Sequence, residues 1–150
     1  MRKSENDELV KEMHVQADKL LHSGIYPDAV KVYTRIVQLN PGDTRALHNK
    51  ACCFYYSKNY EAALKWFNLT LSFKLDSITI YMKACVLRHL GRLLEAVACV
   101  DSAIDVDDAT DSQFSDCIKN FRLITISKLS PEEAALYYRS YYPLTKEALT

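Results

Sequence analysis

The sequence predicts an all-α protein, a right-handed helix-turn-helix repeat solenoid of three repeats followed by C-terminal capping helices. Three alanines, Ala29, Ala63 and Ala96, recur 34 and then 33 residues apart, and self-similarity at such a period is typical of stacked helical repeats. The 150 residues include only 3 glycines and 4 prolines. That is little turn material for an all-β fold with many hairpins.

The second helix of each repeat is predicted from bulky residues that follow each alanine. They are Tyr33, Ile36 and Leu39 in repeat one, Phe67, Thr70 and Phe73 in repeat two, and Val100, Ala103 and Val106 in repeat three. Steps of four, three and three residues place them on one face of a helix. We therefore expect this face to pack.

The first helix of each repeat is predicted from a small residue between two large ones. The three sets are Met13, Ala17 and Leu20; Leu47, Ala51 and Phe54; and Ile80, Ala84 and Leu87. The small residue lets two helices approach closely, while its large neighbours fill the seam between them. One such pair cannot bury its own apolar face, so neighbouring pairs must stack.

This pattern resembles the tetratricopeptide repeat family, over residues 10–43, 44–76 and 77–110. The alanine series, the aromatics Tyr33 and Phe67, the turn glycines Gly24 and Gly91, and Pro41 at the end of repeat one carry the resemblance. The family's first-helix tryptophan and early glycine are replaced, and its closing proline is missing after repeats two and three. The length of 150 residues predicts that residues 1–150 form a single domain.

Two further helices are predicted within residues 111–150. Phe114, Ile118 and Phe121 are helically spaced, although the β-branched "RLITI" locally favours a strand. Ser130, Pro131 and Glu133 have the pattern of a helix start with a capping box, and the helix should stop near Pro143. It carries Tyr137, Tyr138, Tyr141 and Tyr142. We interpret it as a cap with exposed tyrosines or as a second contact surface, for a partner or another copy of the chain.

The resemblance also implies a concave groove lined by the first helix of every repeat. Its predicted partner-binding residues are Lys11, His14, Asp18, Leu21 and His22 in repeat one; Arg45, His48, Asn49, Cys52, Tyr55 and Tyr56 in repeat two; and Ile78, Tyr81, Cys85, Arg88 and His89 in repeat three. All four histidines of the chain fall in this set. That clustering indicates a mixed polar and aromatic peptide groove.

Composition and motifs exclude several other functions. Lysine plus arginine and aspartate plus glutamate both number 19, so a general electrostatic affinity for nucleic acid is not expected. Glycine-rich phosphate loops, GxSxG and HExxH are absent from the sequence, which predicts no enzyme activity and no cofactor. An odd number of cysteines, with neither a signal peptide nor a membrane span, predicts a reduced cytoplasmic or nuclear protein.

Two cysteines and two histidines have a spacing that could suit a metal site. His48 and Cys52 are four residues apart, as are Cys85 and His89, and two cysteines with two histidines suit zinc. The two helices run roughly parallel about 10 Å apart. The two cysteines then face each other, while each histidine lies one turn away from its cysteine, in opposite directions along the helices. We therefore predict that no metal binds.

The favoured function is a non-enzymatic adaptor that binds a peptide segment of a protein partner, with an acidic segment preferred because Lys11, Arg45 and Arg88 outnumber Asp18. An assembly subunit acting through the tyrosine-rich helix is the alternative, and self-association is left open. Family members that bind chaperone tails use a clamp of lysine, asparagine, asparagine, lysine and arginine. The matching residues are His14, Asp18, Asn49, Ile78 and Met82. Only Asn49 is kept and Asp18 would repel a carboxylate, so we predict no chaperone-tail binding.

Overall fold

This computed structural model describes residues 2–105 and 112–141 of the chain. These residues form eight helices and the turns between them. They are α1 (Lys3–His22), α2 (Tyr26–Leu39), α3 (Thr44–Tyr56), α4 (Tyr60–Phe73), α5 (Ser77–His89), α6 (Leu93–Asp105), α7 (Ser112–Ile126) and α8 (Pro131–Tyr141). No strand occurs within these ranges. The all-α prediction is confirmed, including a helix across "RLITI".

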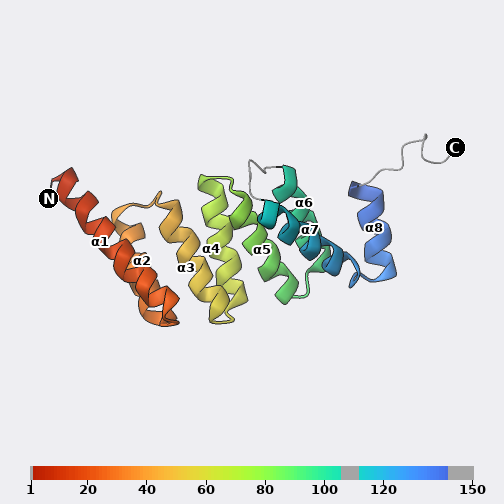
Figure 1. Ribbon diagram of the computed structural model, residues 1–150, viewed down its shortest axis with the longest axis horizontal. Helices are drawn as coiled ribbons and strands as arrows, with labels where there is room; N and C mark the ends of the chain where they lie inside the picture. Colours follow the sequence, from red (N-terminus) through yellow and green to blue (C-terminus); the bar gives the residue numbers. More distant parts are fainter. Residues whose placement is uncertain (1, 106–111, 142–150) are drawn as a thin grey trace.

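The first six helices form three antiparallel pairs that stand in a row (Figure 1). Each pair packs against the next, α2 against α3 and α4 against α5, and α1, α3 and α5 also contact one another along the row. The first helix, α1, and the last helix, α8, lie at opposite ends of the structure (Figure 1). The predicted helical solenoid is therefore confirmed, although α1 begins at Lys3, before the predicted start of repeat one.

Each of these three pairs turns through one residue with a positive φ. Gly24 and Gly91 have φ values of 75° and 76°, and Lys58 takes the equivalent place with φ 62°. Glycine adopts this left-handed conformation without steric cost, whereas a residue with a Cβ pays roughly 1–2 kcal/mol. In every turn the backbone N–H after this residue donates to a carbonyl five residues back, as from Ile25 to Leu20 at 2.9 Å. This bond satisfies an end carbonyl of the helix.

The seams inside the three pairs are fully buried. The six small residues at the predicted close approaches have no exposed surface: Ala17, Ala29, Ala51, Ala63, Ala84 and Ala96. The prediction is wrong for the last packing position, because Leu39 is 45% and Phe73 53% exposed. Both are the final residues of their helices, beyond the reach of the next pair. Val106 lies outside the described residues.

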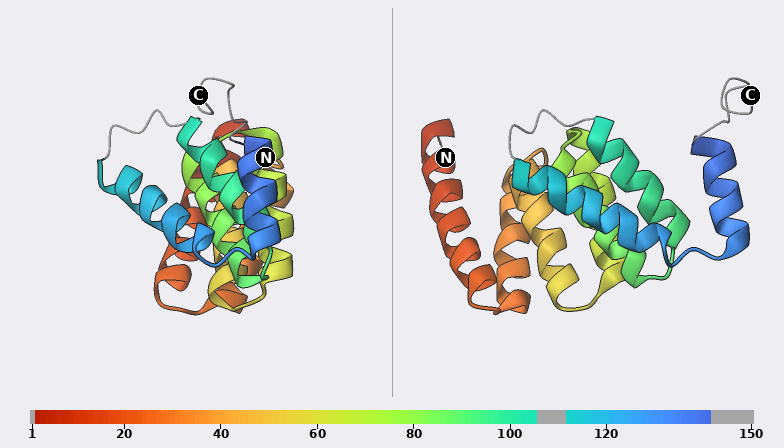
Figure 2. Two further views of the ribbon diagram at one scale, coloured as in Figure 1. Left: turned by 90° about the vertical axis from the view of Figure 1, so that its right-hand side faces the viewer. Right: turned by 45° about the vertical axis from the view of Figure 1, so that its right-hand side comes forward.

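The last two helices form a fourth pair that is open. Phe114, Ile118 and Phe121 continue the first-helix series 34 residues after Ile80, Ala84 and Leu87. However, α8 does not lie along α7 as the partners in the earlier pairs do (Figures 1 and 2). It contacts α6, and Arg122 of α7 donates to the Tyr137 hydroxyl of α8. The small residue of the earlier pairs is replaced by Ile118, whose bulk keeps a partner helix from approaching closely.

The start of α8 was predicted correctly. The Ser130 hydroxyl accepts from the Glu133 N–H at 3.1 Å, and the Glu133 carboxylate accepts from the Ser130 N–H at 2.9 Å. This reciprocal pair is the predicted capping box. The helix follows it directly from Pro131 to Tyr141.

Candidate functional site

The predicted groove residues lie on α1, α3 and α5 but differ widely in exposure. Lys11, His22, Arg45, Tyr56, Ile78 and His89 are exposed; Asp18, Leu21, His48, Asn49, Tyr55, Tyr81 and Arg88 are half-buried; His14, Cys52 and Cys85 are buried. The predicted groove residues therefore do not form one evenly exposed surface, because the last three have little surface open to solvent. They sit where neighbouring helices of the row come together, so side chains of the next helix enclose them.

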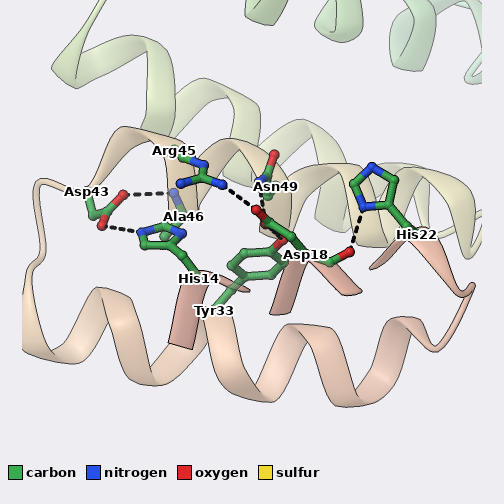
Figure 3. A network of polar contacts seen from close by, with 8 residues as sticks. All are labelled: His14, Asp18, His22, Tyr33, Asp43, Arg45, Ala46 and Asn49. Carbon is green, nitrogen blue, oxygen red and sulfur yellow. Dashed lines mark hydrogen bonds and ion pairs between the residues drawn. The ribbon is translucent and has the colours of Figure 1, made fainter. Parts of the chain in front are cut away.

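Asp18 is the centre of a polar network that joins the first three helices (Figure 3). One carboxylate oxygen accepts from the Tyr33 hydroxyl at 2.6 Å and from the Asn49 amide at 3.2 Å. The other oxygen pairs with the Arg45 guanidinium. Burial and the Asp18 carboxylate raise the pKa of Tyr33 far above its ordinary value, so the phenol remains a donor. Asp18, Arg45 and Asn49 thus connect helices before they meet any ligand.

His14 is part of the same junction. Its Nε2 lies 2.8 Å from an Asp43 carboxylate oxygen, and the other Asp43 oxygen accepts from the Ala46 N–H at 2.9 Å as the N-cap of α3. The pair therefore fixes the start of α3 against α1 (Figure 3). His22, in contrast, is exposed and donates from Nδ1 to the Asp18 carbonyl at 2.6 Å.

His48 ties α3 to α5. The Thr79 hydroxyl donates to Asp76 at 2.7 Å, so it accepts from the Nδ1–H of His48 at 2.9 Å. The ring also meets the edge of Phe67, with centroids 5.5 Å apart. Burial lowers the pKa of His48, and the nearby Asp76 carboxylate opposes that shift only in part. His14 and His48 thus connect neighbouring helices, and His48 also lines a cleft.

A row of aromatic rings, Tyr26, Tyr55, Tyr56, Tyr60 and His89, follows the turn edge of the groove. Tyr56 stacks on Tyr26 at 5.9 Å and meets Tyr55 edge-on at 5.3 Å. His89 meets Tyr55 at 5.6 Å and stacks on Tyr60 at 4.6 Å, with the ring planes 5° apart. The Tyr55 hydroxyl also lies 3.2 Å from Nε2 of His89. We call these five residues the aromatic row.

Two members of the aromatic row are missing from the predicted site. Tyr26 and Tyr60 are the first residues of α2 and α4, and each precedes the seam alanine by three positions. The sequence signal is an aromatic that recurs at the turn with the 34-residue period. This aromatic begins the second helix of its repeat, whereas the resemblance places only first helices along the groove.

The groove face of the third repeat is partly covered by α7. The Arg88 guanidinium lies 4.2 Å from the centre of the Phe121 ring, an attractive cation–π distance. Tyr81 packs against Phe121 at 5.4 Å, and its hydroxyl lies 3.3 Å from the Cys117 sulfur. Tyr81 and Arg88 therefore hold α7 in place, which leaves repeats one and two as the more open part of the groove.

Two clefts open on this side of the molecule. One of about 400 Å³ lies next to the aromatic row and is lined by Asp18, Leu21, His22, Tyr26, Asn49, Cys52 and Tyr56. Another of about 260 Å³ lies at the opposite ends of the helices and is lined by Thr44, Arg45, His48, Thr70, Lys74, Asp76, Ile78 and Thr79. The first contains six of the predicted partner-binding positions, and Asp18 is its one acidic lining residue.

The cysteine and histidine side chains do not converge. In residues 2–105 and 112–141, no group of three or more histidine, cysteine, aspartate or glutamate side chains could hold a metal ion. Burial raises the pKa of Cys52 to about 12 and also raises that of Cys85, so both thiols are protonated at neutral pH. Cys52 is one of the side chains that line the groove side between α1 and α3.

The tyrosines of α8 do not form one surface. Tyr137 is fully buried; its hydroxyl donates to Asp101 at 2.6 Å and accepts from Arg122 at 2.8 Å. Arg122 also donates to Asp101 at 2.7 Å. Tyr138 is 51% exposed. The prediction of a second contact surface is therefore wrong for Tyr137, while Tyr142 and the side chain of Tyr141 lie outside the described residues.

Within the described ranges, none of the helices combines the length and the apolar character needed to cross a bilayer.

Sequence comparison finds one repeat and one partial relative. Residues 79–110 match the tetratricopeptide repeat model. Protein SGT1 homolog of Bos taurus is 41% identical over 66 residues, which covers 41% of this chain. The matched part spans only 19% of that relative.

Structure comparison finds the same fold at low sequence identity. The secretion chaperone SycD of Yersinia enterocolitica, in complex with a peptide of YopD, is 18% identical with a TM-score of 0.77, over 81% of this chain and 95% of SycD. The TPR2B domain of yeast Sti1 in a pHsp70 complex is 18% identical with a TM-score of 0.74, over 80% and 98%. The second such domain of human RPAP3, with the HSP70 peptide SGPTIEEVD, is 16% identical with a TM-score of 0.68, over 78% and 98%. One repeat of the chain, residues 79–110, thus matches the tetratricopeptide repeat model, and the stacked helical pairs have the fold of solved tetratricopeptide repeat domains.

Proposed function

We propose that this protein is a non-enzymatic adaptor that binds a peptide segment of a partner protein along the groove side of α1, α3 and α5. The observation that carries the proposal is the cleft of about 400 Å³ beside the aromatic row. Concave sites lined by aromatic and apolar side chains with a few polar groups are typical of ligand binding. The peptides seen with SycD, Sti1 and RPAP3 support the same role for this fold.

The exposed and half-buried residues of the cleft are the proposed contacts. His22, Asn49 and Tyr56 offer hydrogen bonds and ring faces to a bound segment. His14 and Cys85 act indirectly, through the position of the helices that carry the contacts. The structure around these residues is held by internal bonds, so binding needs little reorganisation.

An acidic partner stays a prediction, and the contacts of the basic residues count against it. Arg45 pairs with Asp18, Lys11 lies 3.0 Å from Glu8, and Arg88 covers the Phe121 ring. A carboxylate in the cleft would also face Asp18. The positive charge available to a ligand is therefore smaller than the sequence indicates.

Binding of a chaperone tail is the second candidate, because Sti1 and RPAP3 are structurally similar and bind such partners. The residues in the clamp positions argue against it here. Asn49, the kept residue, donates to Asp18, and Ile78 cannot pair with a carboxylate. We expect the peptide SGPTIEEVD to bind no better than its scrambled version in fluorescence anisotropy. Tight binding that needs the terminal carboxylate and is lost in Asn49→Ala would reverse this conclusion.

Affinity capture with two matched variants tests the adaptor role. Tyr56 in the groove and Leu136 on α8 are 52% and 50% exposed, so glutamate at either place should leave the fold intact. We expect Tyr56→Glu to lose partners that wild type retains, and Leu136→Glu to keep them. Circular dichroism of both variants controls for folding.

If Leu136→Glu loses partners and Tyr56→Glu keeps them, the result favours the alternative role, an assembly subunit that works through α8. Leu136 and Tyr138 are exposed on that helix, and Leu123 and Ile124 are exposed on α7. If this surface joins copies of the chain, the mass measured by light scattering should rise with concentration. Leu136→Glu should abolish that rise.

A cytoplasmic or nuclear location also stays a prediction.

A further inference from the structure

An aromatic residue ends the first helix of each of the three closed pairs. His22, Tyr56 and His89 are the last residues of α1, α3 and α5, and all three are exposed. The three helices are neighbours in the row, and packed helices lie on the order of 10 Å apart. The three rings therefore mark one edge of the groove at intervals of about 10 Å.

The rings of Tyr56 and His89 are held from behind. Tyr56 stacks on Tyr26, and His89 stacks on Tyr60 while its edge meets Tyr55. A side chain fixed in this way loses little conformational freedom when a ligand binds. The aromatic row is thus a preformed surface rather than a set of mobile side chains.

The interval between the rings matches one extended conformation better than the others. A polyproline II segment has three residues per turn and rises 3.1 Å per residue, so the same side recurs about every 9 Å. A β-strand repeats the same side about every 7 Å. An α-helix could match over two turns, but its carbonyls are already bonded internally. The carbonyls of a polyproline II segment are open to the tyrosine hydroxyls.

The charge of the adjacent cleft points to an uncharged occupant. Asp18 is its one acidic lining residue, and Arg45 neutralises that carboxylate. The remaining lining residues are one histidine, His22, and apolar, aromatic or polar side chains without a formal charge. Burial raises the pKa of Tyr55 and of Tyr56, so both phenols stay protonated and can donate to backbone carbonyls.

We propose that the aromatic row and this cleft bind an uncharged, proline-rich segment of a partner in the polyproline II conformation. The proposal rests on the adaptor function above and names the chemistry of its ligand. Prolines at every third position lie against His22, Tyr56 and His89. The phenol of Tyr56 donates to a carbonyl between them.

Fluorescein-labelled decaproline tests the proposal on the full chain by fluorescence anisotropy. A labelled peptide of five Gly-Ser units, equal in length but without polyproline II structure, is the control ligand. We expect decaproline to bind at least tenfold more tightly than this control. Equal binding of the two peptides, or binding of neither, would overturn the proposal.

Two matched tyrosine variants locate the binding surface. Tyr56 and Tyr138 are 52% and 51% exposed, one in the aromatic row and the other on α8. Tyr56→Leu should weaken decaproline binding at least tenfold, because the leucine lacks both the ring and the hydroxyl, while Tyr138→Leu should leave it unchanged. An equal effect of the two variants would place the ligand elsewhere and refute the proposal.

The outcomes separate this inference from the adaptor function. If decaproline does not bind but partner capture still depends on Tyr56, the proline-rich ligand is wrong and the adaptor role stands. If capture is insensitive to Tyr56→Glu, the adaptor role fails. If decaproline binding is also the same in Tyr56→Leu and in wild type, the proposed proline-rich ligand at the aromatic row is refuted as well.

Discussion

The two ends of the row of helices each contain an aspartate that accepts from a tyrosine hydroxyl and pairs with an arginine, but the packing around the two aspartates differs. Asp18 accepts from Tyr33 at 2.6 Å and pairs with Arg45, which links α1, α2 and α3. Asp101 accepts from Tyr137 at 2.6 Å and from Arg122 at 2.7 Å, which links α6, α7 and α8. The first set lies beside a closed seam of alanines, whereas the second holds a helix that has no such seam.

The difference indicates that a half-buried, hydrogen-bonded aspartate does not by itself determine how firmly helices are joined. Tyr33 belongs to a cluster of buried apolar side chains. Tyr137 is equally buried but belongs to neither cluster formed by the described residues. The closed pairs should therefore unfold together, while α8 should separate from them when its polar contacts are lost.

The largest expected difference between the two regions is in their tolerance of added volume. Ala63 is fully buried in a closed seam, so Ala63→Leu should lower the free energy of unfolding by about 1–3 kcal/mol, the usual cost of overpacking. Ala134 is half-buried on α8, and Ala134→Leu should change it by less than about 0.5 kcal/mol. Urea denaturation measures both. Equal costs would mean that the last pair is as closed as the others.

A smaller effect is expected when one hydroxyl is removed from either aspartate. Tyr33→Phe should reduce the global free energy of unfolding by about 1 kcal/mol, because a buried hydrogen bond is lost while Arg45 and Asn49 still satisfy Asp18. Tyr137→Phe should leave the global midpoint unchanged and accelerate amide exchange in α8 alone. Hydrogen exchange with mass spectrometry distinguishes the two. A loss of midpoint in Tyr137→Phe equal to that in Tyr33→Phe would make α8 part of the cooperative unit.

The smallest effect should come from mild acidification, and it should be confined to the closed region. The folded-state pKa of His48 is lowered by burial, so the unfolded chain binds the proton first as the pH falls below about 6.5. The contribution of neutral His48 to stability is therefore present above that pH and is lost as the pH falls through the lower folded-state pKa.

The test compares wild type with His48→Gln, in urea, at pH 7.5 and pH 5.5. Wild type should lose more stability than the variant on acidification, and exchange in α8 should respond equally in both proteins. If the variant shows the same pH dependence as wild type, His48 does not titrate in this window. Asp76, the charged residue opposing its shift, would then dominate its environment.

The sequence predicts the helices well because their signals are local. Seam residues such as Ala51 and Ala63 repeat with a fixed period, and each is fully buried as expected. The open fourth pair was missed although Ile118 stands in the place of Ala84 at the same interval. One large residue at a small-residue position changes how two helices pack, and a periodic pattern records only that a helix is present.

The groove was predicted less well, because spacing shows which face of a helix a residue is on but not what covers that face. His14 meets Asp43, 29 residues away, and His48 meets Thr79, 31 residues away. Those partners are hydroxyl and carboxylate groups at the starts of neighbouring helices. Their ability to accept from an imidazole becomes visible only when the pairs are stacked.

The packing of each helix against its near neighbours in the chain also sets the order in which the structure forms. Among the described residues each helix contacts mainly its near neighbours in the row, so loop closure costs little entropy and folding should be fast for a chain of this length. The larger cluster of buried side chains spans α3 to α7, which makes it the expected starting point. The ends of the row then add last, so α8 should be the last helix gained during folding and the first lost under load.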